Sequence, residues 1–88
     1  MNGTNTGLVE EVQMTLARWR SRDENLDGLQ EKLQQVMSLV ENDGSNIRAM
    51  LAAAEADIEF IQFAVLRAEQ QAAADGVVEE LRTSLGGL

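Results

Sequence analysis

The chain of 88 residues contains no cysteine, no histidine, no proline and no tyrosine. Without cysteine it has neither disulfides nor thiolate ligands for a metal ion. Without histidine it lacks the commonest metal-binding imidazole and the commonest general base. We therefore expect a protein that is not an enzyme and that holds no cofactor and no metal. Without proline, no residue inside a helix lacks its backbone N–H group.

Basic residues are also scarce, since 7 lysines and arginines stand against 15 acidic residues and give a net charge of −8. Such an anionic surface is repelled by nucleic-acid phosphates and by anionic lipids, so we expect neither as a partner. No apolar run approaches the roughly 20 residues that span a bilayer. Residues 1–7 lack the basic start and apolar stretch of a signal peptide. These features predict a cytoplasmic protein, and secretion by a route without a signal peptide is also compatible with them.

Alanine, leucine, glutamate and glutamine dominate the chain and favour helix, whereas no segment alternates with the period of two that marks a strand. We predict an all-α fold, an antiparallel helical hairpin that resembles a coiled coil and assembles into a helical bundle. Residues 1–6 are expected to be a flexible lead-in, and residues 77–88 a short third helix with a frayed tail. The hairpin occupies residues 7–76, with helices at about 7–41 and 46–74.

Apolar residues in the first predicted helix recur mostly at steps of three, four or seven, the spacing of a coiled-coil seam. They are Leu8, Val12, Trp19, Leu26, Leu29, Leu33, Val36 and Val40. The polar segment 21–25, with Gly28 just beyond it, interrupts this pattern. The pattern alone leaves open whether the helix kinks there or breaks in two.

The segment 43–46 reads Asp-Gly-Ser-Asn and predicts the turn of the hairpin. Gly44 can adopt the left-handed conformation that ends a helix, and Ser45 or Asn46 can cap the helix that follows. The second helix then repeats apolar residues in a regular heptad, at Ile47, Leu51, Ala54, Ile58, Ile61, Val65, Ala68 and Ala72. The pair Asp75-Gly76 is expected to stop this helix.

Folding the second helix back onto the first sets one register for both seams. Val40 then faces Ile47, and Trp19 lies on the flat surface of Ala68 and Ala72. The two heptads meet in a single antiparallel register, with Trp19 opposite small residues, and this agreement supports the hairpin.

The same register brings Arg22, a polar residue within the seam, close to Glu69. A salt bridge between them would set the register, as a polar seam residue does in coiled coils. The alternative is that Arg22 extends its guanidinium into water. The dense carboxylates Glu55, Asp57 and Glu59 have no nitrogen ligand nearby, and we interpret them as a solvated helix face.

A second, narrower apolar stripe runs along the side of the second helix opposite its seam. It contains Ala53, Ala56, Phe60 and Phe63. A helix that is apolar on two sides is buried by more than one neighbour. The short third helix could cover part of the stripe, but we favour a homodimer or a hetero-oligomer that packs a partner helix there.

The sequence thus predicts a non-enzymatic protein–protein interaction module, either an oligomerising adaptor or a small chaperone-like protein. The alternative is an acidic inhibitor that occupies a basic surface of its target. Salt separates the two hypotheses, because ionic strength screens a charge-based contact far more than an apolar one.

Overall fold

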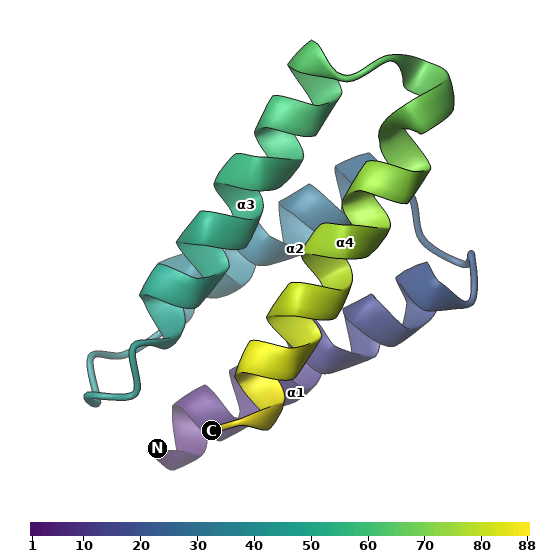
Figure 1. Cartoon of the computed structure of the whole chain (residues 1–88). Coiled ribbons are helices and arrows are strands. Elements are labelled where there is room, and N and C mark those ends of the chain that lie inside the picture. Colours follow the sequence, from purple (N-terminus) through teal and green to yellow (C-terminus); the bar gives the residue numbers. More distant parts are fainter.

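The computed structural model describes all 88 residues and contains helices only. They are α1 (Gly3–Arg20), α2 (Leu26–Leu39), α3 (Ile47–Ala64) and α4 (Arg67–Gly86). Each helix packs on the next along the chain, and α4 returns to pack on α1. In Figure 1, α3 and α4 lie side by side in front of α1 and α2, and the two termini meet at one end. The predicted all-helical fold is confirmed, whereas each of the two long predicted helices is divided in two.

The first division falls in the polar segment 21–25, so the predicted helix over 7–41 breaks instead of kinking. The N–H of Asp23 donates to the carbonyl of Arg18 (2.8 Å), and the N–H of Arg22 donates to that of Trp19 (3.0 Å). This pair of bonds is typical of a helix C-terminus at which the residue just before the last donor adopts a left-handed conformation. Glycine usually occupies that position. Here Arg22 fills it, with φ at 64°. The side chain of Asn25 then caps α2 by accepting from the N–H of Gly28 (2.7 Å).

The N-terminal residues are part of the helical structure, which corrects the predicted flexible lead-in over residues 1–6. Helix α1 begins at Gly3, and the side chain of Asn2 caps it by accepting from the N–H of Asn5 (2.8 Å). Asn5 is buried, and its amide exchanges two hydrogen bonds with the backbone of Glu41, at 2.7 and 2.9 Å. These bonds tie the start of the chain to the loop between α2 and α3.

That loop contains the predicted turn, although α2 already ends at Leu39. Gly44 is left-handed, with φ at 84°, as predicted. The predicted side-chain cap of α3 by Ser45 or Asn46 is absent, because Asn46 itself adopts a left-handed conformation. The loop is held by the Asp43 carboxylate, which accepts from the N–H and hydroxyl of Ser45 and from the N–H of Asn2. These hydrogen bonds lower the pKa of Asp43 far below its ordinary range.

The second division separates α3 from α4 at Val65 and Leu66, so the predicted continuous helix over 46–74 is wrong. No glycine or proline marks this break. Instead, the side-chain amide of Gln70 donates toward the last carbonyls of α3, among them those of Val65 (3.2 Å) and Ile61 (3.3 Å). Carbonyls at a helix C-terminus need such donors, and here α4 supplies one from its own first turns.

Helix α4 continues through Asp75 and Gly76, so the predicted stop at this pair is wrong and residues 77–88 are not a separate short helix. The reason lies in its packing. Ala74, Val78, Leu81 and Leu85 recur at helical spacing and are all buried, which requires one uninterrupted helix across Gly76.

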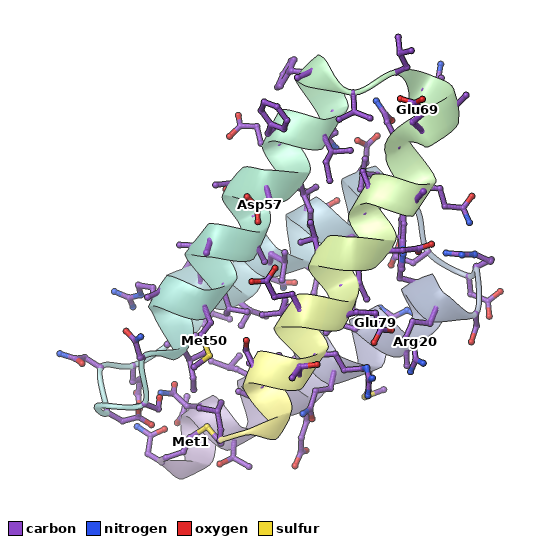
Figure 2. The ribbon with its side chains drawn as sticks, in the orientation of Figure 1. Met1, Arg20, Met50, Asp57, Glu69 and Glu79 are labelled. Atoms are coloured by element: carbon purple, nitrogen blue, oxygen red, sulfur yellow. The ribbon has the colours of Figure 1, made fainter.

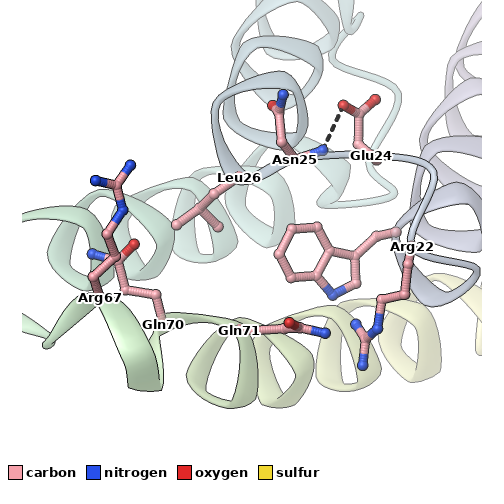
Figure 3. A pocket seen from close by; sticks show the side chains of 8 residues that line it. Arg22, Glu24, Asn25, Leu26, Arg67, Gln70 and Gln71 are labelled. Carbon is pink, nitrogen blue, oxygen red and sulfur yellow. Dashed lines mark hydrogen bonds between the residues drawn. The ribbon is translucent and has the colours of Figure 1, made fainter.

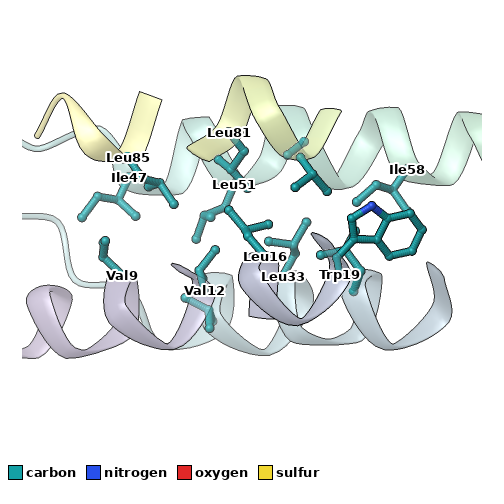
Figure 4. Close-up of a cluster of buried hydrophobic side chains, with 14 of the residues drawn as sticks. Val9, Val12, Leu16, Trp19, Leu33, Ile47, Leu51, Ile58, Leu81 and Leu85 are labelled. Carbon is teal, nitrogen blue, oxygen red and sulfur yellow. The ribbon is translucent and has the colours of Figure 1, made fainter. Parts of the chain in front are cut away.

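Eighteen buried apolar residues form one core between the four helices. In Figure 4, Val12 and Leu16 of α1 point toward Leu51 of α3 and Leu81 of α4. Leu26 is only partly buried, but the other predicted seam residues between it and Ile61 lie in this core: Leu29, Leu33, Val36, Val40, Ile47, Leu51, Ala54, Ile58 and Ile61. By contrast, Ala68 and Ala72 are exposed. Trp19 therefore does not lie on these two alanines as predicted.

Candidate partner-binding face on helix α3

Helix α3 has two sides in contact with the rest of the molecule and one that faces solvent. Its side chains reach α2 through the carboxylate of Glu55, which accepts from the amides of Gln30 and Gln34 (both 3.0 Å). Met50 and Ala54 face α4. At about 100° per residue, the remaining side contains only alanine and phenylalanine. We call this exposed set the outer stripe: Ala49, Ala52, Ala53, Ala56, Phe60, Phe63 and Ala64.

The predicted interface residues Ala53, Ala56, Phe60 and Phe63 thus share one exposed face. Phe60 is 65% exposed and Phe63 is 84% exposed, and Leu66 beyond them is 72% exposed. Alanine on a solvent face is explained by its helix propensity, but phenylalanine is not, because aromatic residues lose side-chain freedom in a helix. Grouped large apolar side chains on a surface are typical of an interaction site.

A groove of about 300 Å³ runs beside the outer stripe, between α3 and α4. Its apolar lining is Ala49, Met50, Ala53, Ala54, Val77 and Leu81. Asp57 stands on the α3 wall and Glu80 on the α4 wall. Figure 2 shows Asp57 and Met50 on the face where α3 and α4 lie side by side. Because Ala49 and Ala53 belong to both, the groove and the outer stripe form one continuous surface.

A second cleft, of about 360 Å³, opens where the α1–α2 loop meets the first half of α4. Trp19 lines this cleft, and Figure 3 shows Arg22 on one side of it, Arg67 on the other and Gln71 between them. Trp19 is only 6% exposed, so little of its indole is available to a ligand. Arg22 in the wall of the cleft bonds to Asp75, and Gln70 bonds to the end of α3, so we assign this cleft a structural role.

Asp75 is the centre of that polar cluster. Its carboxylate accepts from the indole Nε1 of Trp19 (2.9 Å) and from both Nη atoms of Arg22 (2.8 and 3.1 Å). The bonds from Arg22, and then that from Trp19, hold the pKa of Asp75 below its ordinary value of 3.8. The same contact raises the pKa of Arg22.

The salt bridge predicted between Arg22 and Glu69 is therefore replaced by one between Arg22 and Asp75. Glu69 is exposed and makes no ion pair. The break at Val65 and Leu66 changes which residues of α4 face α1. A register that assumes one uninterrupted helix therefore assigns the wrong partner to Arg22.

The three dense carboxylates of α3 do not converge on one point. Glu55 bonds to α2, whereas Asp57 faces the groove beside α4. Glu59 is exposed between these two sides, at the edge of the outer stripe.

Sequence reasoning missed some residues of this surface for two reasons. The helical periodicity that places Ala53 and Phe60 on this face would also place Ala49 and Ala52 there if it were followed to the start of the helix. Glu80 has no such signal, because only the packing of α4 on α3 brings it to the groove.

Comparison of the chain with family models, with curated proteins and with solved structures finds no match. None of its four helices is long and apolar enough to cross a membrane.

Proposed function

We propose that this chain is a non-enzymatic protein–protein interaction module, of the adaptor or small-chaperone type, that packs the outer stripe of α3 against a helix of a partner. The observation that supports the proposal is the exposure of Phe60 and Phe63 on a helix face without a single charged residue. Buried apolar residues fill the core separately, so these two rings are not needed there.

The two halves of the outer stripe suit different tasks. Near the N-terminus of α3, the small side chains of Ala49 and Ala53 leave a flat surface that another helix can approach closely. At its other end, Phe60 and Phe63 provide large anchors of the kind that dominates binding energy at interfaces. Together they fit recognition of a helix that lies lengthwise along α3.

The expected affinity is moderate. Burying a phenylalanine side chain contributes about 1.5–3 kcal/mol, so the two rings contribute about 3–6 kcal/mol before other contacts are counted. Association costs at least about 4 kcal/mol in lost rotational and translational freedom. The two rings alone barely exceed this cost, so contacts of the alanine surface and of its neighbouring side chains must contribute further binding free energy.

The test replaces both rings, as Phe60→Ser with Phe63→Ser. The molar mass of the chain is measured by light scattering, alone over a range of concentrations and as the complex purified under native conditions. We expect the double variant to lose the assembly while its circular dichroism retains the helical signal. An unchanged assembly, or a loss of helicity along with it, would overturn the proposal.

A matched control removes exposed apolar side chains from other helices. Met14 on α1 is 62% exposed and Leu39 at the end of α2 is 54% exposed. Met14→Ser with Leu39→Ser should leave the assembly intact, because neither residue belongs to the outer stripe. An equal loss in this control would show that surface hydrophobicity in general, and not the outer stripe, holds the assembly together.

A further inference from the structure

We propose that the partner helix is basic: an amphipathic helix whose apolar ridge lies along the groove between α3 and α4 and whose lysine or arginine side chains face Asp57 and Glu80. This inference rests on the proposed function and names the class of its partner. The inference is supported by the acidic residues around the groove, because the outer stripe itself contains no charged residue.

The groove supplies two walls for such a ridge. Ala53 and Ala54 belong to α3, and Val77 and Leu81 belong to α4. All four side chains are apolar, and the alanines leave the depth that a larger side chain of the partner can fill. This arrangement is typical of a helix that binds in a groove through residues spaced three and four apart.

The two carboxylates on the walls of the groove have no partner within the chain. Asp57 and Glu80 make neither an ion pair nor a side-chain hydrogen bond, unlike the residue next to Glu80. Glu79 pairs with Arg20 at 2.9 Å and with Arg82 at 2.9 Å. Figure 2 shows Glu79 beside Arg20, on the α1 side of α4. The arginines thus neutralise one side of α4 and leave the groove side negative.

No basic residue lines the groove itself, and Arg67 lies beyond it, beside Phe63 at the other end of the outer stripe. Glu59 flanks the outer stripe on the side away from the groove and is also unpaired. Arg48, the only base of α3, directs its guanidinium at the carbonyl of Val40. A binding surface with an apolar floor and an acidic rim selects a partner with a basic rim, because complementary charge steers encounter and penalises other partners.

Charge also disfavours a second copy of the chain as the occupant of the groove. Each copy has a net charge of −8 and would bring its own Asp57, Glu59 and Glu80 to the contact. Like charges placed opposite one another at an interface are repulsive, and no arginine lines the groove to compensate them.

The experiment uses three fluorescent peptides of 18 residues, the length of α3. The first has an alanine–leucine ridge flanked by lysines. The second keeps the ridge and replaces each lysine with glutamate. The third scrambles the first, which keeps its charge but destroys the ridge. Fluorescence anisotropy gives the Kd of each for the full chain, and we expect the first to bind at least about tenfold more tightly than the other two.

Two charge variants of the chain then locate the contact. Asp57→Asn with Glu80→Gln should weaken binding of the first peptide about five- to tenfold and flatten its dependence on salt. The control, Glu10→Gln with Glu31→Gln, removes the same charge from exposed, unpaired acids of α1 and α2. It should change the Kd less than about twofold, since screening weakens interactions between distant surface charges.

Equal binding of the acidic peptide, equal binding of the scrambled one, or an equal effect of the two double variants would overturn the inference. So would a dimer of the pure chain that Phe60→Ser with Phe63→Ser abolishes, because a second copy would then be the occupant. The proposed function would survive each of these results. It fails if a native assembly persists without the two phenyl rings, or if their replacement removes the helical signal as well.

Discussion

The indole Nε1 of Trp19 donates a hydrogen bond of 2.9 Å to Oδ1 of Asp75, a residue 56 positions further along the chain. The same oxygen accepts from Arg22 at 2.8 Å. One carboxylate therefore fastens both the end of α1 and the loop after it to the middle of α4. In the absence of disulfides, this cluster is a polar link between the first helix and the last.

Asp75→Ala should destabilise the protein by about 1–3 kcal/mol, because the N–H of the buried Trp19 loses its acceptor. Urea denaturation, followed by the fluorescence of the single tryptophan, measures the change. The control is Glu69→Ala, which removes the partner that the hairpin register had assigned to Arg22. It should change the free energy of unfolding by less than about 0.5 kcal/mol, as exposed substitutions usually do. Equal losses would contradict the assignment to Asp75.

Acid should remove the contribution of Asp75 in a defined direction. Its pKa is lower in the folded protein than its ordinary value of 3.8, so the folded state binds the proton less readily than the unfolded state. The stabilisation is therefore present above about pH 4 and is lost as pH falls through the folded-state pKa.

The measurement compares the wild-type chain with Asp75→Asn in urea titrations from about pH 7 down to pH 3. Protonation of the other carboxylates also relieves repulsion in this acidic chain, but that effect is common to both proteins and cancels in the difference. The wild type should be the more stable at neutral pH, and the difference should shrink below about pH 4. A difference that grows in acid would contradict the lowered pKa.

The sequence predicts most of the buried residues of α2 and α3, because their seams are regular. Leu33 and Leu51 illustrate this, since both are fully buried as the heptads require. It does not predict the two helix breaks. At the first, Arg22 stands where the expected signal is glycine. At the second, Gln70 supplies a hydrogen-bond donor from the following helix, and no local pattern announces it.

The outer stripe shows the same division. Its position on α3 follows from helical periodicity, so Phe60 and Phe63 could be placed opposite the seam. The acidic groove beside it could not, because Glu80 comes to face Asp57 only when α4 packs on α3. A surface built by one helix is readable from sequence, whereas a surface shared by two requires the fold.

Three leucines of α2 should differ in their contributions to stability according to burial. Leu29 is fully buried, Leu26 is partly buried at the first turn, and Leu39 is 54% exposed. Leu29→Ala should cost about 2–5 kcal/mol, because it removes apolar contacts and leaves a cavity. Leu39→Ala should cost less than about 0.5 kcal/mol, with Leu26→Ala between them. Thermal unfolding monitored by circular dichroism gives the order, and an equal loss at Leu39 would contradict the packing of α2.

Gly76 tests whether α4 is continuous, because the sequence favours a helix stop at this residue and the structure places it inside a helix. A Cβ atom added there meets nothing within 4 Å, and the backbone does not adopt positive φ. Gly76→Ala should therefore stabilise the protein by about 0.5–1 kcal/mol, since alanine loses less conformational freedom in a helix. Gly44→Ala is the matched contrast: its φ of 84° strains any other residue, and it should destabilise the protein by about 1 kcal/mol. Urea midpoints of the two variants decide the matter, because a helix that stopped at residue 76 would gain nothing from alanine there.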